Sequence, residues 1–598
     1  MVQYKLSQNI PPRRLLMKVC LILAVILEFG IDSVHGVAGP EDVLGSLYPP
    51  SFAVCFSDGD MKVFRNYIVL DADKWGCSDE TLSASVERVK NDQWKLEIVT
   101  KNSAIKEVYF PWFEQKVVLN SYPADDIVYY PYLFGILMKP EARIEWDWWG
   151  VDYPGVSFAP VMIIADDTDA IMAAAINWPP KKVRPIYSLR RMSMLYSEKI
   201  EPHSSSTYMA MIAKTKGDAA KGYYPWQHAL DNYKVWLKDK MSQEGLYPIS
   251  YAQWMQKVDG FMNVQLENVK DFDIGAIYEK WNKWSNVFPW IQFWGQMSEG
   301  YPNPEYGCCL EKKQMHPRYM PELVTFAKNI TRLEGFKGHV GYYSRPAHDT
   351  ILAASELQGG ETGLGALLEW LRVNKEMYYA NVFYLDTVGG KYMGDPLRVA
   401  KLFKGVFPED TFIEFPVDIY PTAFLVSGSL GGRNWRDKKW GKEESDLSRG
   451  FQIVHFPQFG RYLLDDRIIF LGQSNGDHVL WGQTADYWVE RNAFLLGAKF
   501  DVMTPEDGKG GPNTLDTALS LAISERKRVN WWGRNPVYYD VNDIYNVPAS
   551  ISVRRFVDAN GKNLLVVDNW RQVSGLKINF KDKIVEIPAR KLCIIDLF

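Results

Sequence analysis

The sequence predicts a multidomain α/β protein with an N-terminal antiparallel β-sandwich, a central (β/α)₈ TIM-type barrel and a small C-terminal β-domain. Short alternating strand patterns fill residues 43–214, and apolar strands alternate with helical stretches over 287–541. Strand patterns return in the tail. At 598 residues the chain is also too long for one hydrophobic core.

The first segment, residues 1–39, has the pattern of a signal peptide. Basic residues Arg13, Arg14 and Lys18 precede the apolar run 19–27, and the small residue Gly36 follows at cleavage distance. The run is too short for a stable transmembrane anchor. We therefore expect a secreted protein, extracellular or lumenal, with no stable membrane anchor after signal cleavage.

Residues 40–215 predict the β-sandwich domain. Turns rich in Pro, Gly and Asp separate strand-like runs at 95–100, 107–110, 161–164, 170–173 and 206–212. The pattern then becomes helical, most clearly over 228–237, and predicts a helical linker over 216–285.

Residues 286–545 predict the catalytic (β/α)₈ barrel, and residues 546–598 the C-terminal β-domain. Seven candidate barrel strands can be identified, which leaves the eighth unassigned. They lie at 288–294, 339–344, 382–386, 412–415, 452–455, 467–471 and 498–502. The tail predicts strands at 552–556, 564–567 and 590–595.

Two of the predicted barrel strands end in a carboxylate, Asp386 and Glu414. An amphipathic stretch at 396–404 supplies a crossover helix between them, so both side chains are expected at the C-terminal face of a barrel. Two carboxylates that flank one bond are what glycoside hydrolysis requires. The alternative, that either residue caps a helix or pairs with an arginine, stays open.

Other polar and aromatic residues near the predicted strand ends suit a sugar site, because they can hydrogen-bond hydroxyls or stack on a pyranose ring. The candidate substrate-binding residues are Trp294, Gln296, Tyr343, Arg345, Asp418 and Asp477. The eight histidines form no His-x-His or His-Glu-x-x-His pattern, so we expect no metal and no cofactor.

Composition narrows the partners. A formal charge of -4 gives no electrostatic reason to expect nucleic acid. The 22 Trp, 33 Tyr and 29 Phe exceed the usual aromatic share; core packing explains most of them, and the remainder suits sugar stacking. Cys55 and Cys77 could close a loop in the first domain as a disulfide, while the pairing of the cysteines stays open.

The order of domains, together with the Phe-Tyr-Leu-Asp386 strand, resembles secreted glycoside hydrolases of the α-galactosidase and α-glucosidase clan, especially the endo-α-N-acetylgalactosaminidase-like enzymes. The resemblance implies that Asp386 is the nucleophile of a retaining mechanism. In the endo-α-N-acetylgalactosaminidase-like group it also implies Glu414, on the next strand, as the acid/base. In the α-galactosidase-like group the acid/base is an Asp two strands later, which no motif here fixes.

The predicted function is therefore a glycosidase, an O-glycosyl hydrolase that acts on oligosaccharides, polysaccharides or glycoconjugates. The alternative is a non-catalytic carbohydrate-binding protein on the same barrel. A serine hydrolase is disfavoured because no Gly-x-Ser-x-Gly elbow occurs. The sequence indicates neither the sugar nor the oligomeric state.

Overall fold

A computed structural model of the chain describes most of the N-terminal half and the core elements of the remainder. The described residues are 49–113, 116–119, 125–131, 135–141, 152–153, 157–217, 224–245, 254, 260–265, 274–285, 289–294, 320–332, 338–344, 372, 375–376, 379–385, 411–414, 428–430, 444–446, 451–455, 458–463, 469–472, 499–504, 535–538, 552–557, 563–568, 575–580, 583–589 and 592–597. The predicted signal peptide, 1–39, and the predicted crossover helix, 396–404, lie outside them.

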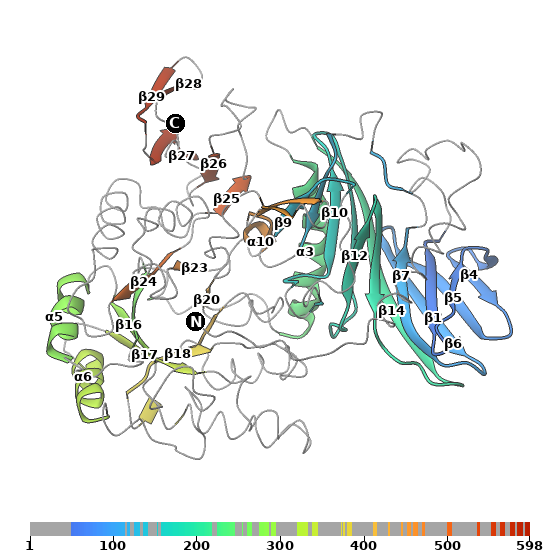
Figure 1. Cartoon of the computed structure of the whole chain (residues 1–598), viewed down its shortest axis with the longest axis horizontal. Coiled ribbons are helices and arrows are strands. Elements are labelled where there is room, and N and C mark those ends of the chain that lie inside the picture. The colour runs from blue at the N-terminus through green and yellow to red at the C-terminus, as the bar shows by residue number, and fades with distance from the viewer. Residues whose placement is uncertain are drawn as a thin grey trace.

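Two antiparallel sheets build the N-terminal region (Figure 1). The smaller sheet has the order β12 (Arg184–Ser188), β13 (Arg191–Tyr196), β7 (Ile105–Trp112), β1 (Ser51–Phe56) and β2 (Met61–Phe64). The larger has the order β21 (Glu444–Asp446), β22 (Phe451–His455), β9 (Ile136–Met138), β8 (Ile127–Tyr130), β10 (Val161–Ala165), β11 (Asp169–Ala175), β14 (Ser205–Lys216), β6 (Gln93–Thr100), β5 (Leu82–Lys90), β4 (Lys74–Ser78) and β3 (Ile68–Asp71). These sheets fit the predicted β-sandwich.

The two sheets are joined through their inner faces. Tyr196 of β13 and Tyr208 of β14 have ring centroids 4.7 Å apart, and the hydroxyl of Tyr130 on β8 donates to the carbonyl of Pro185 on β12 at 2.8 Å. Strands β5 and β6 alternate buried and more exposed residues, as strands with one solvated face do. The core of this region therefore lies between the sheets.

Helix α3 (Pro225–Gln243) covers the other face of the large sheet over β10, β11 and β14. This explains why all five residues of β10 and six of the seven in β11 are buried: both faces of these strands are packed. The helix begins with Pro225, a residue that fits the first turn of a helix. The ring of the next residue, Trp226, stacks on Tyr129 of β8 with the ring centroids 5.1 Å apart.

The predicted barrel strand at 452–455 is wrong. Residues Phe451–His455 form β22, which pairs antiparallel with β9 of the N-terminal sheet. The following helix α10 (Gln458–Leu463) packs on α3, where the hydroxyl of Tyr462 donates to both carboxylate oxygens of Asp231, at 2.9 and 3.0 Å. A segment between two barrel strands thus completes the N-terminal sheet.

Eight other strands pair in parallel and close into a barrel. Their order is β15 (Gly260–Gln265), β16 (Trp290–Trp294), β17 (His339–Ser344), β18 (Val382–Leu385), β19 (Thr411–Glu414), β20 (Gly428–Leu430), β23 (Ile469–Gly472) and β24 (Lys499–Thr504). Helix α5 (Ile274–Trp284) follows β15, and α6 (Met320–Arg332) follows β16. Strands β15 and β20 were not among the predicted ones.

The C-terminal tail forms two further antiparallel sheets. One contains β25 (Asn535–Tyr538), β26 (Ser552–Val557), β27 (Asn563–Asp568) and β30 (Leu592–Leu597); the other contains β28 (Leu576–Phe580) and β29 (Lys583–Ile587). Strands β26, β27 and β30 overlap the three predicted in this tail.

The candidate disulfide between Cys55 and Cys77 is not formed. Both residues are free thiols, because Cys55 lies on β1 of the small sheet and Cys77 on β4 of the large one. Burial raises the pKa of the Cys55 thiol, and burial together with the nearby Asp79 raises the pKa of Cys77 to about 11.

Candidate active site

The C-terminal ends of the parallel barrel strands define the candidate site. In β18 and β19, Leu385 pairs with Ile413, and in β19 and β20, Glu414 pairs with Leu430. Because these strands are parallel, their carboxyl ends meet at one rim of the barrel, where catalytic residues of closed parallel barrels are found.

Three predicted site residues have a described backbone at this rim. Trp294 is the last residue of β16, Tyr343 is the next-to-last residue of β17, and Glu414 ends β19. The structure thus brings the backbones of these three residues to the same end of the barrel, on the neighbouring strands β16 and β17 and on β19, which lies beyond β18.

The remaining predicted site residues lie outside the described part of the chain. They are Gln296, Arg345, Asp386, Asp418 and Asp477. Their roles stay predictions.

The barrel interior beneath the rim contains a buried amide that the sequence reasoning missed. Gln292 of β16 is fully buried and pairs with Gly341 of β17. A Cβ on residue 341 would lie 1.9 Å from Gln292 Oε1, so the glutamine side chain occupies the space above the glycine. The next residue, Phe293, faces the other way and packs edge-on against Phe326 of α6, with the two ring centroids 5.6 Å apart.

This alternation is a signal that sequence could have provided. Gln292 is the single polar residue in the run 290–294, and the period of two of a strand places it on the face opposite to Ile291 and Phe293. The inner face is the barrel interior, and the outer face is covered by a helix.

The opposite end of the barrel carries a packed polar cluster. Trp254 stacks on His339 at 3.6 Å, and Asn381 Oδ1 accepts the Val340 N–H at 2.7 Å. Asn381 Nδ2 also lies 3.2 Å from His339 Nδ1. His339 begins β17 and Asn381 directly precedes β18, so the cluster lies at the amino ends of the strands, where a structural role is expected.

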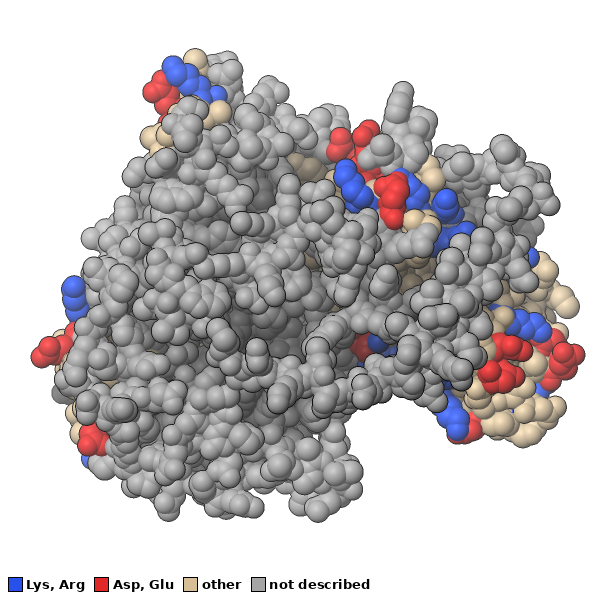
Figure 2. Space-filling model, viewed as in Figure 1, with Lys and Arg blue, Asp and Glu red and all other residues tan. Residues whose placement is uncertain are grey.

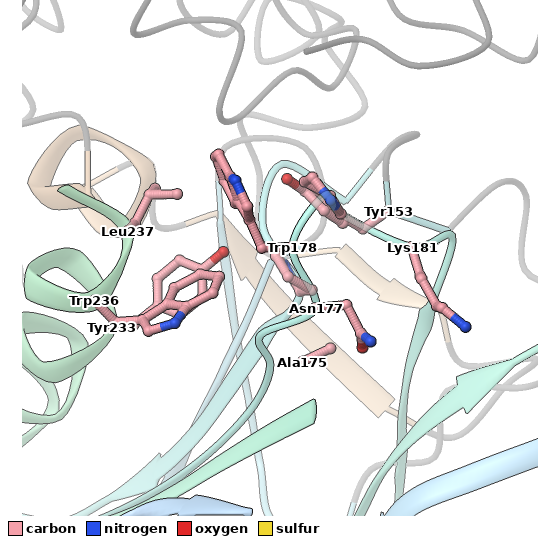
Figure 3. Close-up of a pocket in the computed structure, with 10 residues that line it drawn as sticks. Tyr153, Ala175, Asn177, Trp178, Lys181, Tyr233, Trp236 and Leu237 are labelled. Carbon is pink, nitrogen blue, oxygen red and sulfur yellow. The ribbon is translucent and has the colours of Figure 1, made fainter. Parts of the chain in front are cut away.

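A pocket lies between the large N-terminal sheet and α3 (Figure 3). The aromatic part of its lining consists of Tyr153, Trp178, Tyr233 and Trp236. Its polar groups are engaged within the protein: Lys181 donates to Glu198 at 2.8 Å and Ser206 at 3.0 Å, and the Trp178 indole N–H donates to Glu244 at 2.8 Å.

The pocket amide is satisfied in the same way. Asn177 Oδ1 accepts from the Tyr196 hydroxyl at 3.1 Å and from the Met209 N–H at 3.3 Å. Since these partners are internal, the pocket is a packing junction between sheet and helix, and the barrel rim remains the candidate site.

Two negative findings apply to the described residues. Among them, no group of three His, Cys, Asp or Glu side chains is arranged to hold a metal ion. None of the described helices combines the length and apolar character that crossing a membrane requires.

Comparisons with known proteins place the fold. No family model matches the chain. No curated protein matches its sequence. Among solved structures, an α-N-acetylgalactosaminidase from Bifidobacterium bifidum, in complex with GalNAc, aligns with a TM-score of 0.54 at 11% identity and covers 86% of this chain and 92% of that chain.

Two enzymes of glycoside hydrolase family GH31 also align. An α-xylosidase from a soil metagenome, complexed with xylose, has a TM-score of 0.45 at 10% identity and covers 89% of this chain and 97% of its own. A dextranase from Flavobacterium johnsoniae, complexed with glucose, aligns with a TM-score of 0.39 at 12% identity. This alignment covers 92% of this chain and 74% of the dextranase. Both scores are below 0.5, so the fold rests on the first alignment: the chain has a glycosidase-like fold.

Proposed function

We propose that this chain is a retaining glycoside hydrolase whose catalytic domain is a (β/α)₈ TIM-type barrel. The observation that carries the proposal is the pairing of Leu385 with Ile413 in neighbouring parallel strands. Each candidate carboxylate, Asp386 and Glu414, is the next residue in sequence after one member of this pair.

The spacing of strands supports a retaining mechanism. Neighbouring strands in a sheet lie roughly 4.7–4.9 Å apart, and residues at the same level on both strands point to the same face. Retaining glycosidases place their two carboxyl groups about 5–5.5 Å apart, whereas inverting enzymes leave about 6.5–9.5 Å for a water. Carboxylates that follow directly paired residues on adjacent strands suit the shorter separation.

In the proposed reaction, Asp386 attacks the anomeric carbon while Glu414 donates a proton to the leaving oxygen. The glycosidic C–O bond breaks, and a glycosyl ester with Asp386 forms. Glu414 then takes a proton from water, the water oxygen attacks the anomeric carbon, and Asp386 leaves as a carboxylate.

The substrate is proposed to be an oligosaccharide, a polysaccharide or a glycoconjugate. Trp294 and Tyr343 are candidates for stacking on a sugar ring, because both occupy the ends of strands that lead to the rim. Gln296, Arg345, Asp418 and Asp477 are proposed to bind hydroxyl groups.

We also propose that the protein is secreted, as the basic residues followed by the apolar run 19–27 indicate. N-terminal sequencing of protein recovered from the medium of expressing cells tests this. A mature terminus near residue 40 supports secretion, and retention inside the cells with residues 1–39 intact contradicts it.

The test of function is hydrolysis of a panel of aryl α- and β-glycosides and mucin-type glycans. Wild-type protein, Asp386→Asn and Glu414→Gln are compared, and circular dichroism confirms that each variant is folded. We expect turnover by the wild type and its loss in Asp386→Asn. Binding of glycans without turnover by the wild type would replace the enzyme with a carbohydrate-binding protein.

A further inference from the structure

The edge strand of the large N-terminal sheet exposes three consecutive apolar residues. In β3, Ile68 is 72% exposed, Val69 69% and Leu70 59%. Successive residues of a strand face opposite sides, so both faces of β3 are open to solvent. Among the described strands, β3 pairs with β4 alone and forms the last strand of its sheet.

This edge is held firmly in place. The carbonyl of Asp73, in the turn between β3 and β4, accepts the backbone N–H of Arg88 on β5 at 2.8 Å. The Leu70 side chain lies beside Gly76 of β4, where a Cβ on residue 76 would be 2.7 Å from Leu70 Cδ1; because Leu70 is 59% exposed and can rotate, it is the backbone hydrogen bond that orders this edge. The strand is therefore an ordered template.

Such an edge is unusual in a protein that acts alone. Proteins commonly protect their edge strands with a central charge, a proline or a covering segment, because an exposed apolar edge pairs readily with another strand. Here the charged residues Arg65, Asp71 and Asp73 flank the apolar centre without interrupting it.

We propose that β3 is a dimer interface at which a second copy of this chain adds its own β3 in antiparallel orientation, with Val69 on the two-fold axis. In this register the residue numbers of each pair sum to 138. Val69 then faces Val69 of the second copy, Ile68 faces Leu70, and Arg65 faces Asp73. Both Arg65 and Asp73 are exposed, and Asp73 also lies 4.0 Å from Arg88 Nε of its own chain. The strand is complementary to itself in its apolar pattern and in charge.

Neighbouring registers lose part or all of this match. A shift of the sum to 136 keeps a charge pair, Arg65 opposite Asp71, but places Leu70 opposite Asn66. A shift of the sum to 137 places Arg65 opposite Ala72, and a shift to 140 places Val69 opposite Asp71. Cross-strand apolar and opposite-charge pairs stabilise an antiparallel ladder, whereas mismatched charges do not. The sequence of β3 thus favours a second β3 over an unrelated strand.

The position of the edge is compatible with activity at the barrel. Strand β4, the neighbour of β3, lies at the end of the molecule farthest from the barrel strands (Figure 1). At this end, uncharged surface lies among acidic and basic side chains (Figure 2). A dimer through β3 would join the two large sheets into one and leave both barrels at the outer ends.

The first experiment measures the mass of the full-length mature protein in solution by sedimentation velocity over a concentration series. We expect a monomer–dimer equilibrium. Val69→Lys should raise the dissociation constant about tenfold or more, because two lysines would face each other across the axis. The matched control is Val235→Lys on the exposed face of α3, since Val235 is also 69% exposed; it should leave the equilibrium unchanged.

A second experiment tests the register. A residue on the two-fold axis meets its own copy, so Val69→Cys should form an intermolecular disulfide under mild oxidation, seen as a band of doubled mass on a non-reducing gel. Val235→Cys should not. Arg65→Asp should weaken the dimer, and Arg65→Asp combined with Asp73→Arg should restore it.

The outcomes separate the alternatives. A protein that stays monomeric at every concentration, or a dimer that survives Val69→Lys and gives no cross-link through residue 69, overturns the proposal. If circular dichroism shows that Val69→Lys is unfolded, the Val69→Cys cross-link and the Arg65→Asp/Asp73→Arg double variant still test whether β3 forms the dimer.

Discussion

Gly341→Ala tests the inner face of the barrel beneath the candidate site. The new Cβ would lie 1.9 Å from Oε1 and 2.9 Å from Cδ of Gln292, and Gln292 is fully buried, so its side chain has no solvent to move into. Overpacking of this kind costs about 1–3 kcal/mol. A strain-free Gly→Ala change instead stabilises by about 0.4–1 kcal/mol through the unfolded chain. The clash therefore decides the sign, and Gly341→Ala should destabilise the barrel.

A matched control is Gly76→Ala on β4. There the added Cβ would lie 2.7 Å from Leu70 Cδ1, but Leu70 is 59% exposed and can rotate away, so we expect a change near zero. Urea unfolding followed by circular dichroism gives the comparison, with the barrel transition analysed separately because a multidomain chain need not unfold in one step.

A double-mutant cycle isolates the contact. In a Gln292→Ala background the added methyl of Gly341→Ala should cost less than in the wild type, but part of the cost should remain, because the new Cβ would still lie 2.9 Å from Trp290 Nε1. Equal costs in both backgrounds, or a Gly341→Ala protein as stable as the wild type, would show that Gln292 does not lie over Gly341 and that the assignment of the inner face is wrong.

Three further predictions concern other parts of the chain. Tyr462→Phe removes the hydroxyl that donates to both carboxylate oxygens of Asp231. Since hydrogen bonds to charged groups contribute about 1.5–3 kcal/mol, urea unfolding should show a loss of unfolding free energy of at most that size. No loss would show that α10 does not dock on α3. Burial acts to raise the pKa of Asp79. The hydrogen bonds that its carboxylate accepts from Lys62, Thr81 and the Leu82 N–H outweigh burial and hold this pKa well below its usual range. The ionised form is thus favoured in the folded state, and the stabilisation it provides is fully present above about pH 4 and lost as the pH falls through the lowered pKa. Asp79→Asn should therefore be less stable than the wild type at pH 7, and the difference in stability should shrink below pH 4. A difference that stays constant with pH would contradict this. Cys77, with a pKa of about 11, should react with a thiol reagent at pH 8 about a hundredfold more slowly than an ordinary thiol, and a peptide map without reduction should show no disulfide to this residue.

Sequence periodicity predicted individual strands well where the pattern was long and clearly bounded. The run 339–344 coincides with β17, because an apolar and aromatic stretch there is bounded by a glycine and a charged residue. By contrast β20, Gly428–Leu430, has three residues and no periodicity to detect. Its place in the barrel depends on pairing with β19 and β23.

Pairing partners were less predictable than strands. The run 452–455 was correctly read as a strand and wrongly placed in the barrel, because a short strand-like run does not indicate whether its partner is a parallel barrel strand or the antiparallel strand β9. The same limit applies to the candidate disulfide: the sequence separation of Cys55 and Cys77 allows a loop, but the sheet to which each strand belongs is decided by long-range packing. The candidate site was predictable at the level of strand ends, and its side-chain arrangement was not.

The central claim is that Asp386 is the nucleophile of a retaining glycosidase, and azide rescue of Asp386→Gly tests it most directly. On an aryl glycoside that the wild type hydrolyses, the variant should be inactive in buffer and regain turnover when azide is added, because azide attacks from the face that the carboxylate has vacated. The product should be a glycosyl azide of inverted anomeric configuration. Wild-type-like hydrolysis by Asp386→Gly without azide, or an azide product of retained configuration, would contradict the account.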